Sequence, residues 1–413
     1  MNINVGIINL PNAGSSSLLD LLSPSFSPWR PSKDLAYFTT THPQACSVEV
    51  RNKISDFIIQ RVLNSESDRL DSTSITYLSL PALIQSSDTH PISSTTLPTL
   101  KNMDVIIYLL RGFENDTVSQ YYNTMDPIQE FILLSSEVFH YDMKLIQELI
   151  QSKLHHKSQE NLIEIEILMR FWKYMSGNDF EDMAIQDVLR ASPNFDVKKC
   201  KHLHQFHWKA EESRLLDKYR FLSWKSGICL LNMNELSYLR QRSLVYDRFL
   251  QFLSDSQINI KTYKISLDFE EKFRRFDSEE YRIANPLYQS VIPILNDLVL
   301  FVHHRIHIYT IDDFQHSASM HCICQGLTAI EAASMIHRNV KLGFVAAEVL
   351  AFSDLEQHGD RETAKLFGKV RQVGKQYIFN DGDIVQFVYR APPPVSEIAN
   401  PRINRNALPI LRS

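Results

Sequence analysis

The sequence predicts a doubly wound α/β domain that is interrupted by a helical hairpin and followed by a smaller α+β domain. Three observations predict this fold. Short apolar segments rich in β-branched residues, typical of buried strands, recur up to Met233. Two long segments between Pro127 and Lys218 instead repeat their apolar residues every three to four positions, as amphipathic helices do. Alternating segments return after Leu298, where we expect the second domain.

The expected strands of the first domain begin almost at the N-terminus. They cover residues 3–8, 75–80, 103–110 and 227–233. Residues 11–14, Pro-Asn-Ala-Gly, break the first strand, and the three serines that follow are good N-terminal residues for a short helix over 18–22. The sequence therefore predicts a strand, a tight turn and a helix at its start.

The change of period after Pro127 predicts an insertion over about residues 127–218 in a first domain of residues 1–297. Apolar residues from Ile128 to Leu154, and again over 162–175, keep helical spacing with polar residues between them. Two helices packed as an antiparallel hairpin explain this pattern, and the simplest role for them is a packing arm.

The second domain is expected over residues 298–391. Residues 306–310 alternate as a strand does, and residues 330–337 form a short amphipathic helix. Asn380-Asp381-Gly382-Asp383 stands between apolar segments 375–379 and 384–389, which is typical of a β-hairpin. The tail over 392–413 opens with three prolines and is expected to be extended or disordered.

Composition limits the class of protein. The chain has 413 residues, 44% of them hydrophobic and 22% charged, which suits two or three domains with full cores. The net charge of −5 gives no global basic field for duplex nucleic acid. No apolar run approaches the roughly 20 residues that span a membrane. Five cysteines without a C-x-x-C pair and no leader pattern favour the cytoplasm, with no membrane partner.

The turn after the first strand has the spacing of a phosphate-binding loop. Residues 9–16 follow the pattern G-x-x-x-x-G-K-[ST], and the strand before and helix after supply its usual context. Asn9 replaces the first glycine, and asparagine still visits left-handed backbone angles. Ser15 replaces the lysine, so the loop lacks the ammonium that neutralises the phosphates.

Further segments, in order along the chain, carry a resemblance to a known family. They are V-G-I-I-N-L-P-N-A-G at 5–14, F-T-T-T-H-P at 38–43, D-V-I-I-Y-L-L-R-G-F-E at 104–114, M-D-P-I at 125–128, L-N-M-N-E at 231–235, and three blocks at 330–337, 341–349 and 377–384. Together they resemble YchF-type Obg-like ATPases from about Val5 to Tyr389. In that family the first segment reads V-G-I-V-G-L-P-N-V-G-K-S-T.

The resemblance implies a P-loop domain followed by a TGS domain over 298–391, with ATP and Mg²⁺ as ligands and GTP a weaker alternative. Ser16 and Thr40 match the family's two Mg²⁺-binding hydroxyls. Asn232 and Glu235 match its N-M-x-E motif, which recognises the base and favours ATP, and Ser266 matches its last nucleotide-loop serine. The residues expected at the nucleotide are Asn12, Ala13, Gly14, Ser15, Ser16, Ser17, Asn232, Met233 and Glu235. A strand-end cap and a solvated helix start are the structural alternatives for Asn232 and Glu235.

Departures from the family concern hydrolysis. Ser79 stands where switch II has its Mg²⁺-linked aspartate, and Ala82 where it has the glycine that contacts the γ-phosphate. No glycine occurs between Gly14 and Gly112, so a Gly-rich lid is excluded there. Phosphoryl transfer depends on positioning and charge neutralisation. We therefore assign no catalytic residue and expect a pseudo-ATPase scaffold, with a slow Mg²⁺-dependent ATPase that uses Ser16 and Thr40 as the alternative.

The partners expected for this protein are implied by the family resemblance and not by the spacing of its residues. The family implies association with ribosomes and translation, or with RNA, through the TGS domain and the helical arm. Within the arm, Cys200, His202, His204 and His207 lie close together, but C-x-H-x-H-x-x-H is not a known zinc spacing. A solvated linker explains them best, and contact with RNA through Phe206 and Trp208 is the alternative. The oligomeric state is not predicted.

Overall fold

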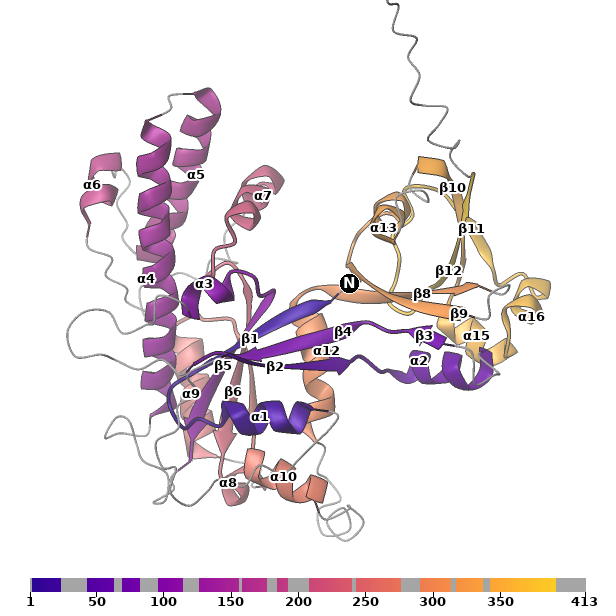
Figure 1. The fold of residues 1–413 in the computed structure, drawn as a ribbon, viewed down its shortest axis with the longest axis horizontal. Coiled ribbons are helices and arrows are strands. Elements are labelled where there is room, and N and C mark those ends of the chain that lie inside the picture. The colour runs from indigo at the N-terminus through magenta and orange to yellow at the C-terminus, as the bar shows by residue number, and fades with distance from the viewer. Residues whose placement is uncertain are drawn as a thin grey trace, which may run out of the picture. The chain divides into compact units, whose positions relative to one another are not determined.

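The computed structural model describes residues 2–23, 43–62, 69–81, 96–113, 126–155, 158–176, 184–191, 208–239, 243–275, 290–312, 317–336 and 342–390. They form two compact units, each assembled from separate parts of the chain (Figure 1). The N-terminal unit combines residues 2–49 with 74–303. The C-terminal unit combines residues 50–73 with the chain from His304 onward.

The N-terminal unit is built on a six-stranded sheet of order β2-β4-β1-β5-β6-β7. Its strands are β1 (Ile3–Asn9), β2 (Gln44–Glu49), β4 (Ser74–Ser79), β5 (Val105–Gly112), β6 (Ser226–Met233) and β7 (Lys261–Ile265). Every pairing is parallel except that of the edge strand β2 with β4. The chain passes from β1 to β4 on one side and returns to β5 on the other. The strand order therefore reverses beside the carboxyl end of β1, where doubly wound sheets bind their ligands.

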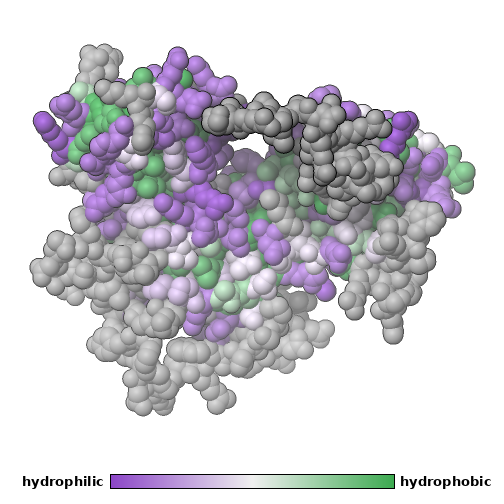
Figure 2. All heavy atoms as spheres, turned by 45° about the horizontal axis from the view of Figure 1, so that its top comes forward, coloured by the Kyte–Doolittle hydropathy of each residue, from purple (hydrophilic) through white to green (hydrophobic). Residues whose placement is uncertain are grey.

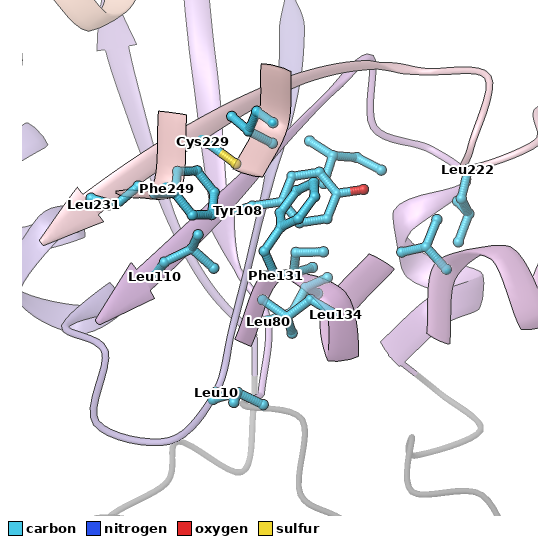
Figure 3. Packing of buried hydrophobic residues seen from close by; sticks show 14 of the residues in the cluster. Leu10, Leu80, Tyr108, Leu110, Phe131, Leu134, Leu222, Cys229, Leu231 and Phe249 are labelled. Atoms are coloured by element: carbon cyan, nitrogen blue, oxygen red, sulfur yellow. The ribbon is translucent and has the colours of Figure 1, made fainter. Parts of the chain in front are cut away.

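The helices of this unit either pack on its sheet or form the inserted arm. They are α1 (Ser15–Leu22), α3 (Thr96–Leu100), α4 (Pro127–Leu154), α5 (Gln159–Ser176), α6 (Ile185–Arg190), α7 (Ala210–Tyr219), α8 (Glu235–Leu239), α9 (Leu244–Asp255), α10 (Leu267–Arg275) and α12 (Val291–Val302). On one face α4 and α9 pack against alternate residues of β5 and β6. Figure 3 shows Tyr108, Phe131 and Phe249 at the centre of this cluster, with ring centroids 5.5 Å and 5.7 Å apart. The predicted doubly wound fold is confirmed.

The helical insertion forms its own core. Helices α4 and α5 run side by side, as Figure 1 shows, and α6 and α7 pack against them. Phe171 is fully buried among the aromatic rings of Trp208, Phe221 and Trp224. The arm is joined to the start of β6 by Asp142, whose buried carboxylate accepts hydrogen bonds from the backbone N–H groups of Leu222 (3.1 Å) and Ser223 (2.7 Å). The predicted hairpin is thus present, and its long helices begin at Pro127 and Gln159.

The C-terminal unit contains a second six-stranded sheet, of order β11-β10-β12-β8-β9-β3. Its elements are α2 (Lys53–Phe57), the π-helix η1 (Ile58–Val62), β3 (Arg69–Asp71), β8 (Arg305–Asp312), β9 (Ser317–Cys324), α13 (Ala329–Ile336), β10 (Phe344–Leu350), α15 (Phe352–His358), α16 (Arg361–Leu366), β11 (Arg371–Val373) and β12 (Ile384–Tyr389). Small alanines of α13 pack against β8, β9 and β10 in its core.

The structure differs from the sequence-based prediction at two points of this unit. Residues 50–73, expected in the first domain, belong here because β3 pairs with β9 and the Thr73 hydroxyl donates to the Met320 carbonyl. The turn at Asp381 and Gly382 exists, but residues 375–379 do not form the partner strand. Instead β12 pairs with β10 and β8, because the turn itself bonds to His307 of β8.

The surface carries scattered hydrophobic residues among hydrophilic ones (Figure 2). The most exposed of these side chains include Leu366 at the end of α16, Leu244 at the start of α9 and Leu236 in α8. Among the described residues, no helix combines the length and the apolar character that crossing a membrane requires. Residues 392–413 and the histidine-rich segment 200–207 lie outside the described residues.

Candidate nucleotide site

The turn after β1 has the backbone form that a phosphate cradle needs. Asn12 and Gly14 both adopt left-handed conformations, with φ of 66° and 104°, and α1 begins directly after Gly14. A Cβ at Gly14 would stand 2.6 Å from Leu267 Cδ1 and 3.0 Å from Asn232 Nδ2, so only glycine fits. Successive left-handed and helical residues turn backbone N–H groups toward one concave surface at the N-terminus of α1, which favours an anion.

Asn232, at the end of β6, bridges this turn to the start of α10. Its Nδ2 donates to the Ala13 carbonyl at 3.0 Å, and its Oδ1 accepts from the Leu267 N–H at 3.2 Å. The side chain is 5% exposed, and its two partners are as buried. Strand β6 pairs with β5 and not with β1. The Asn232 amide therefore connects the turn after β1 to β6 and α10, which lie beyond β5.

Glu235 begins α8 three residues beyond Asn232, and its carboxylate is part of an ion-pair network. Lys272 of α10 lies 2.7 Å from Glu235 Oε2 and 2.7 Å from Asp268 Oδ2. These hydrogen bonds, to Asp268 first and Glu235 second, raise the pKa of Lys272. All three side chains retain solvent exposure. The network therefore presents a carboxylate and an ammonium at the accessible edge of the site.

The positions that depart from the phosphate-loop pattern are buried. Ser15, at the lysine position, is 7% exposed. Asn9 donates to the Leu10 carbonyl through Nδ2, but its buried Oδ1 has no hydrogen-bond partner among the described residues. The same holds for the Oγ of Ser79, the residue at the position of the expected aspartate. No charge is present at any of these three positions.

A buried carboxyl group, that of Glu130, contacts the backbone at the end of β5. Glu130 of α4 accepts a hydrogen bond from the backbone N–H of Arg111 at 2.8 Å. Burial raises the pKa of Glu130 to about 7, against the lowering effect of that hydrogen bond and of the Arg111 charge. Arg111 lies opposite Asn232 in the β5–β6 pairing, so this contact stiffens the strand end beside the bridging amide.

The structure brings most of the predicted nucleotide residues together. Ala13 is buried under the turn, and the first turn of α1 contains the half-buried Ser16 and Ser17. Met233 is 2% exposed and belongs to the hydrophobic core, so its side chain is turned away from the site surface. Thr40 and Ala82 lie outside the described residues.

The groups that are present suit the phosphates and the base of an ATP–Mg²⁺ complex better than they suit the metal ion. The turn offers backbone N–H groups to phosphate, and Glu235 offers an acceptor to a base. For Mg²⁺ the described residues supply the Ser16 hydroxyl but no carboxylate at the end of β4, where Ser79 stands. No group of three or more His, Cys, Asp or Glu side chains suited to a metal occurs within the described part of the chain.

Sequence reasoning missed Lys272 and Asp268. Their spacing of four residues is common on solvated helices and carries no functional signal by itself. The match of Ser266 to the family indicates that the segment before this helix lies at the nucleotide, and the bond from Leu267 to Asn232 shows that the helix begins at the site. The sequence signals available for these two residues were Asn232 at the end of a predicted strand and, later in the chain, a charged helical segment to which no role was assigned.

Comparison with known proteins agrees with the geometry. Residues 307–390 match the YchF-GTPase C-terminal family, described as a protein of unknown function (DUF933). Obg-like ATPase 1 of Caenorhabditis elegans is 26% identical over 397 residues, which cover 94% of this chain and 93% of the relative. Obg-like ATPase 1 of Homo sapiens is 24% identical over 396 residues, covering 95% and 93%. The solved structure of the Schizosaccharomyces pombe YchF GTPase has a TM-score of 0.72 at 18% identity, covering 94% of this chain and 98% of that one.

The parallel sheet with a glycine-dependent phosphate turn at its strand-order reversal defines a P-loop nucleoside-triphosphatase fold. Within that class, the chain is similar over nearly its whole length to the YchF-type Obg-like ATPases. The resemblance predicted from the sequence is thereby confirmed, and so is the fold class of a P-loop domain with a C-terminal α+β domain.

Proposed function

We propose that this protein binds ATP in the turn over residues 12–17 and hydrolyses it weakly or not at all. The observation that carries the proposal is the Asn232 bridge, which holds the phosphate turn to the segment that bears Glu235 and Lys272. Through this bridge the turn that would hold the phosphates and the segment that would contact the base are fixed to each other. ATP rather than GTP is favoured because Asn232 and Glu235 match the N-M-x-E motif, which favours ATP in the family that the chain resembles.

Weak hydrolysis is supported by neutral residues at two charged positions of the family and by a larger residue at one glycine position. Ser15 supplies no ammonium, Ser79 no carboxylate, and Asn9 fills the space of a glycine. Losing one such electrostatic group costs about 10²- to 10³-fold in rate, although losses within one unit do not add. Ser16 and Thr40 would then be the remaining Mg²⁺ ligands. The alternative function is a slow ATPase that depends on Mg²⁺ bound by these two hydroxyl groups.

Titration with a fluorescent ATP analogue, with and without Mg²⁺, tests the proposal. We expect a dissociation constant below about 10 μM, which Glu235→Ala raises, with no measurable phosphate release. The exposed neighbour Asn234 provides the matched control, and Asn234→Ala should leave binding unchanged. Turnover that Ser16→Ala abolishes would make the protein an enzyme. Absence of binding at millimolar ATP would refute a nucleotide site altogether.

The wider role proposed is that of a cytoplasmic, nucleotide-dependent scaffold in translation, with the C-terminal unit as its TGS domain. The helical arm supports partner binding through aromatic residues that stay partly exposed. Arg170 stacks 4.6 Å from the Trp208 ring and also pairs with Glu212. Salt-dependent co-sedimentation with ribosomes, compared between the full chain and a chain lacking residues 127–218, tests the arm. Equal sedimentation would remove the arm from the proposal.

A further inference from the structure

Lys272 has a hydrogen-bond donor that its known contacts do not use. An ammonium group carries three N–H donors. Two of them are directed at Glu235 Oε2 and Asp268 Oδ2, each 2.7 Å away. Within the described residues the third donor has no acceptor, and Glu235 Oε1 has no donor. A free donor and a free acceptor therefore stand side by side.

Two backbone anchors place this pair relative to the phosphate turn. The Leu267 N–H bond to Asn232 fixes the first residue of α10, and Lys272 follows within the same short helix. Glu235 is the first residue of α8, directly beyond the strand that ends with Asn232 and Met233. The donor and the acceptor thus come from the two helices that begin at the bridging amide.

The chemistry of the pair matches one edge of adenine. That edge presents the N6 amine as a donor and the ring N1 as an acceptor on neighbouring atoms, and nucleotide-binding proteins recognise bases through such edges. Guanine presents two neighbouring donors, N1–H and the N2 amine, which a carboxylate satisfies best with both oxygens. The Lys272 ammonium is a donor beside Glu235, so it would face the N1 acceptor of adenine but the N1–H donor of guanine.

We propose that Lys272 is a specificity-determining residue of the nucleotide site. It donates a hydrogen bond to adenine N1 while Glu235 accepts from the N6 amine. This inference rests on the proposed function, since it concerns the same site, but it adds a contact that Glu235 alone does not supply. Asp268 holds the ammonium from the side opposite the base and takes no part in recognition.

The experiment compares binding of ATP with that of 1-deaza-ATP, which has a carbon in place of N1. The wild-type protein should bind ATP about tenfold more tightly than 1-deaza-ATP, as the loss of one charge-assisted hydrogen bond predicts. In Lys272→Met the two ligands should bind equally. Asp268→Asn should keep the tenfold ratio, because the donor remains. The exposed helix residue Lys144 serves as control, and Lys144→Met should behave as wild type.

Each other outcome overturns a distinct claim. If Lys272→Met weakens both ligands and preserves their ratio, Lys272 only positions Glu235 and the inference fails while the proposed function stands. If the wild type binds GTP as tightly as ATP, the assignment to adenine fails. If the wild type binds no nucleotide, the proposed function fails and the inference with it. Near-UV circular dichroism of each variant is compared with that of the wild type, and an unchanged spectrum shows that the substitution leaves the fold intact.

Discussion

Replacing Asn232 by leucine should destabilise the N-terminal unit by about 2–6 kcal/mol. The magnitude follows from the two hydrogen bonds of its amide, to the Ala13 carbonyl and from the Leu267 N–H. Leucine has nearly the same shape, so little packing is lost. Both backbone partners are in buried residues, and each buried polar group left unpaired costs about 1–3 kcal/mol. The bridge is therefore worth a large fraction of a typical domain stability of roughly 5–15 kcal/mol.

Urea denaturation followed by tryptophan fluorescence measures this loss in the right unit, because the tryptophans among the described residues, Trp172, Trp208 and Trp224, belong to the N-terminal unit. The matched control is Asn234→Leu, which removes an exposed cap of α8 (Ser237 N–H to Asn234 Oδ1, 2.8 Å) and should cost about 1 kcal/mol. Asn232→Asp keeps the bond from Leu267 but turns an oxygen toward the Ala13 carbonyl. It should be destabilised at neutral pH and recover as acid protonates the new carboxyl group. If Asn232→Leu costs no more than Asn234→Leu, the bridge is not what holds the site together.

Two further predictions concern the turn and the arm. Gly14→Ala should lower the free energy of unfolding by about 1–3 kcal/mol more than Gly368→Ala does. Both glycines have positive φ, but of the two only Gly14 has a neighbour within 3 Å of the added Cβ. Equal losses of stability in thermal denaturation would contradict this steric argument. Burial raises the pKa of Asp142 to about 6, so between pH 4 and 6 the folded state keeps a proton that the unfolded state has lost. Stability should therefore fall as pH rises through that window, by up to about 3 kcal/mol, and Asp142→Asn should remove this part of the slope; an unchanged slope would assign it to other groups.

The sequence predicts the elements of the N-terminal unit well because their signals are local. Buried parallel strands such as Val105–Gly112 are continuous apolar runs, and the arm helices repeat their apolar residues along one face. The phosphate turn was equally visible, since a strand, a glycine and a serine-rich helix start are neighbours in sequence. These features need no knowledge of the distant chain.

Long-range pairings were not predictable in the same way. The short strand Arg69–Asp71 pairs with a strand almost 250 residues later, and nothing local indicates that residues 50–73 leave the first unit. At Asp381 and Gly382 the turn signal was correct, but its bonds to His307 decide the pairing of the strand that follows. In each case a partner far along the chain overrides the local pattern.

The same distinction applies to the site. Asn232 and Glu235 follow from a motif, whereas the position of Lys272 depends on how the start of α10 bonds to Asn232. Burial of Asn9 could not be inferred either, because an asparagine directly after a strand predicts an exposed turn residue. The unpartnered oxygens of Asn9 and Ser79 mark the place where the family carries other groups.

The central claim is that the turn over residues 12–17 still holds a triphosphate although its ammonium has been lost, and Ser15→Lys tests it most directly. If phosphate lies in the turn, the restored charge should tighten ATP binding about tenfold or more, as one charge-assisted hydrogen bond of roughly 1.5–3 kcal/mol predicts. Ser15→Met, which adds a side chain of similar length without the charge, should not tighten binding. An affinity that stays flat in Ser15→Lys, or that rises equally in both variants, would contradict a phosphate site in this turn.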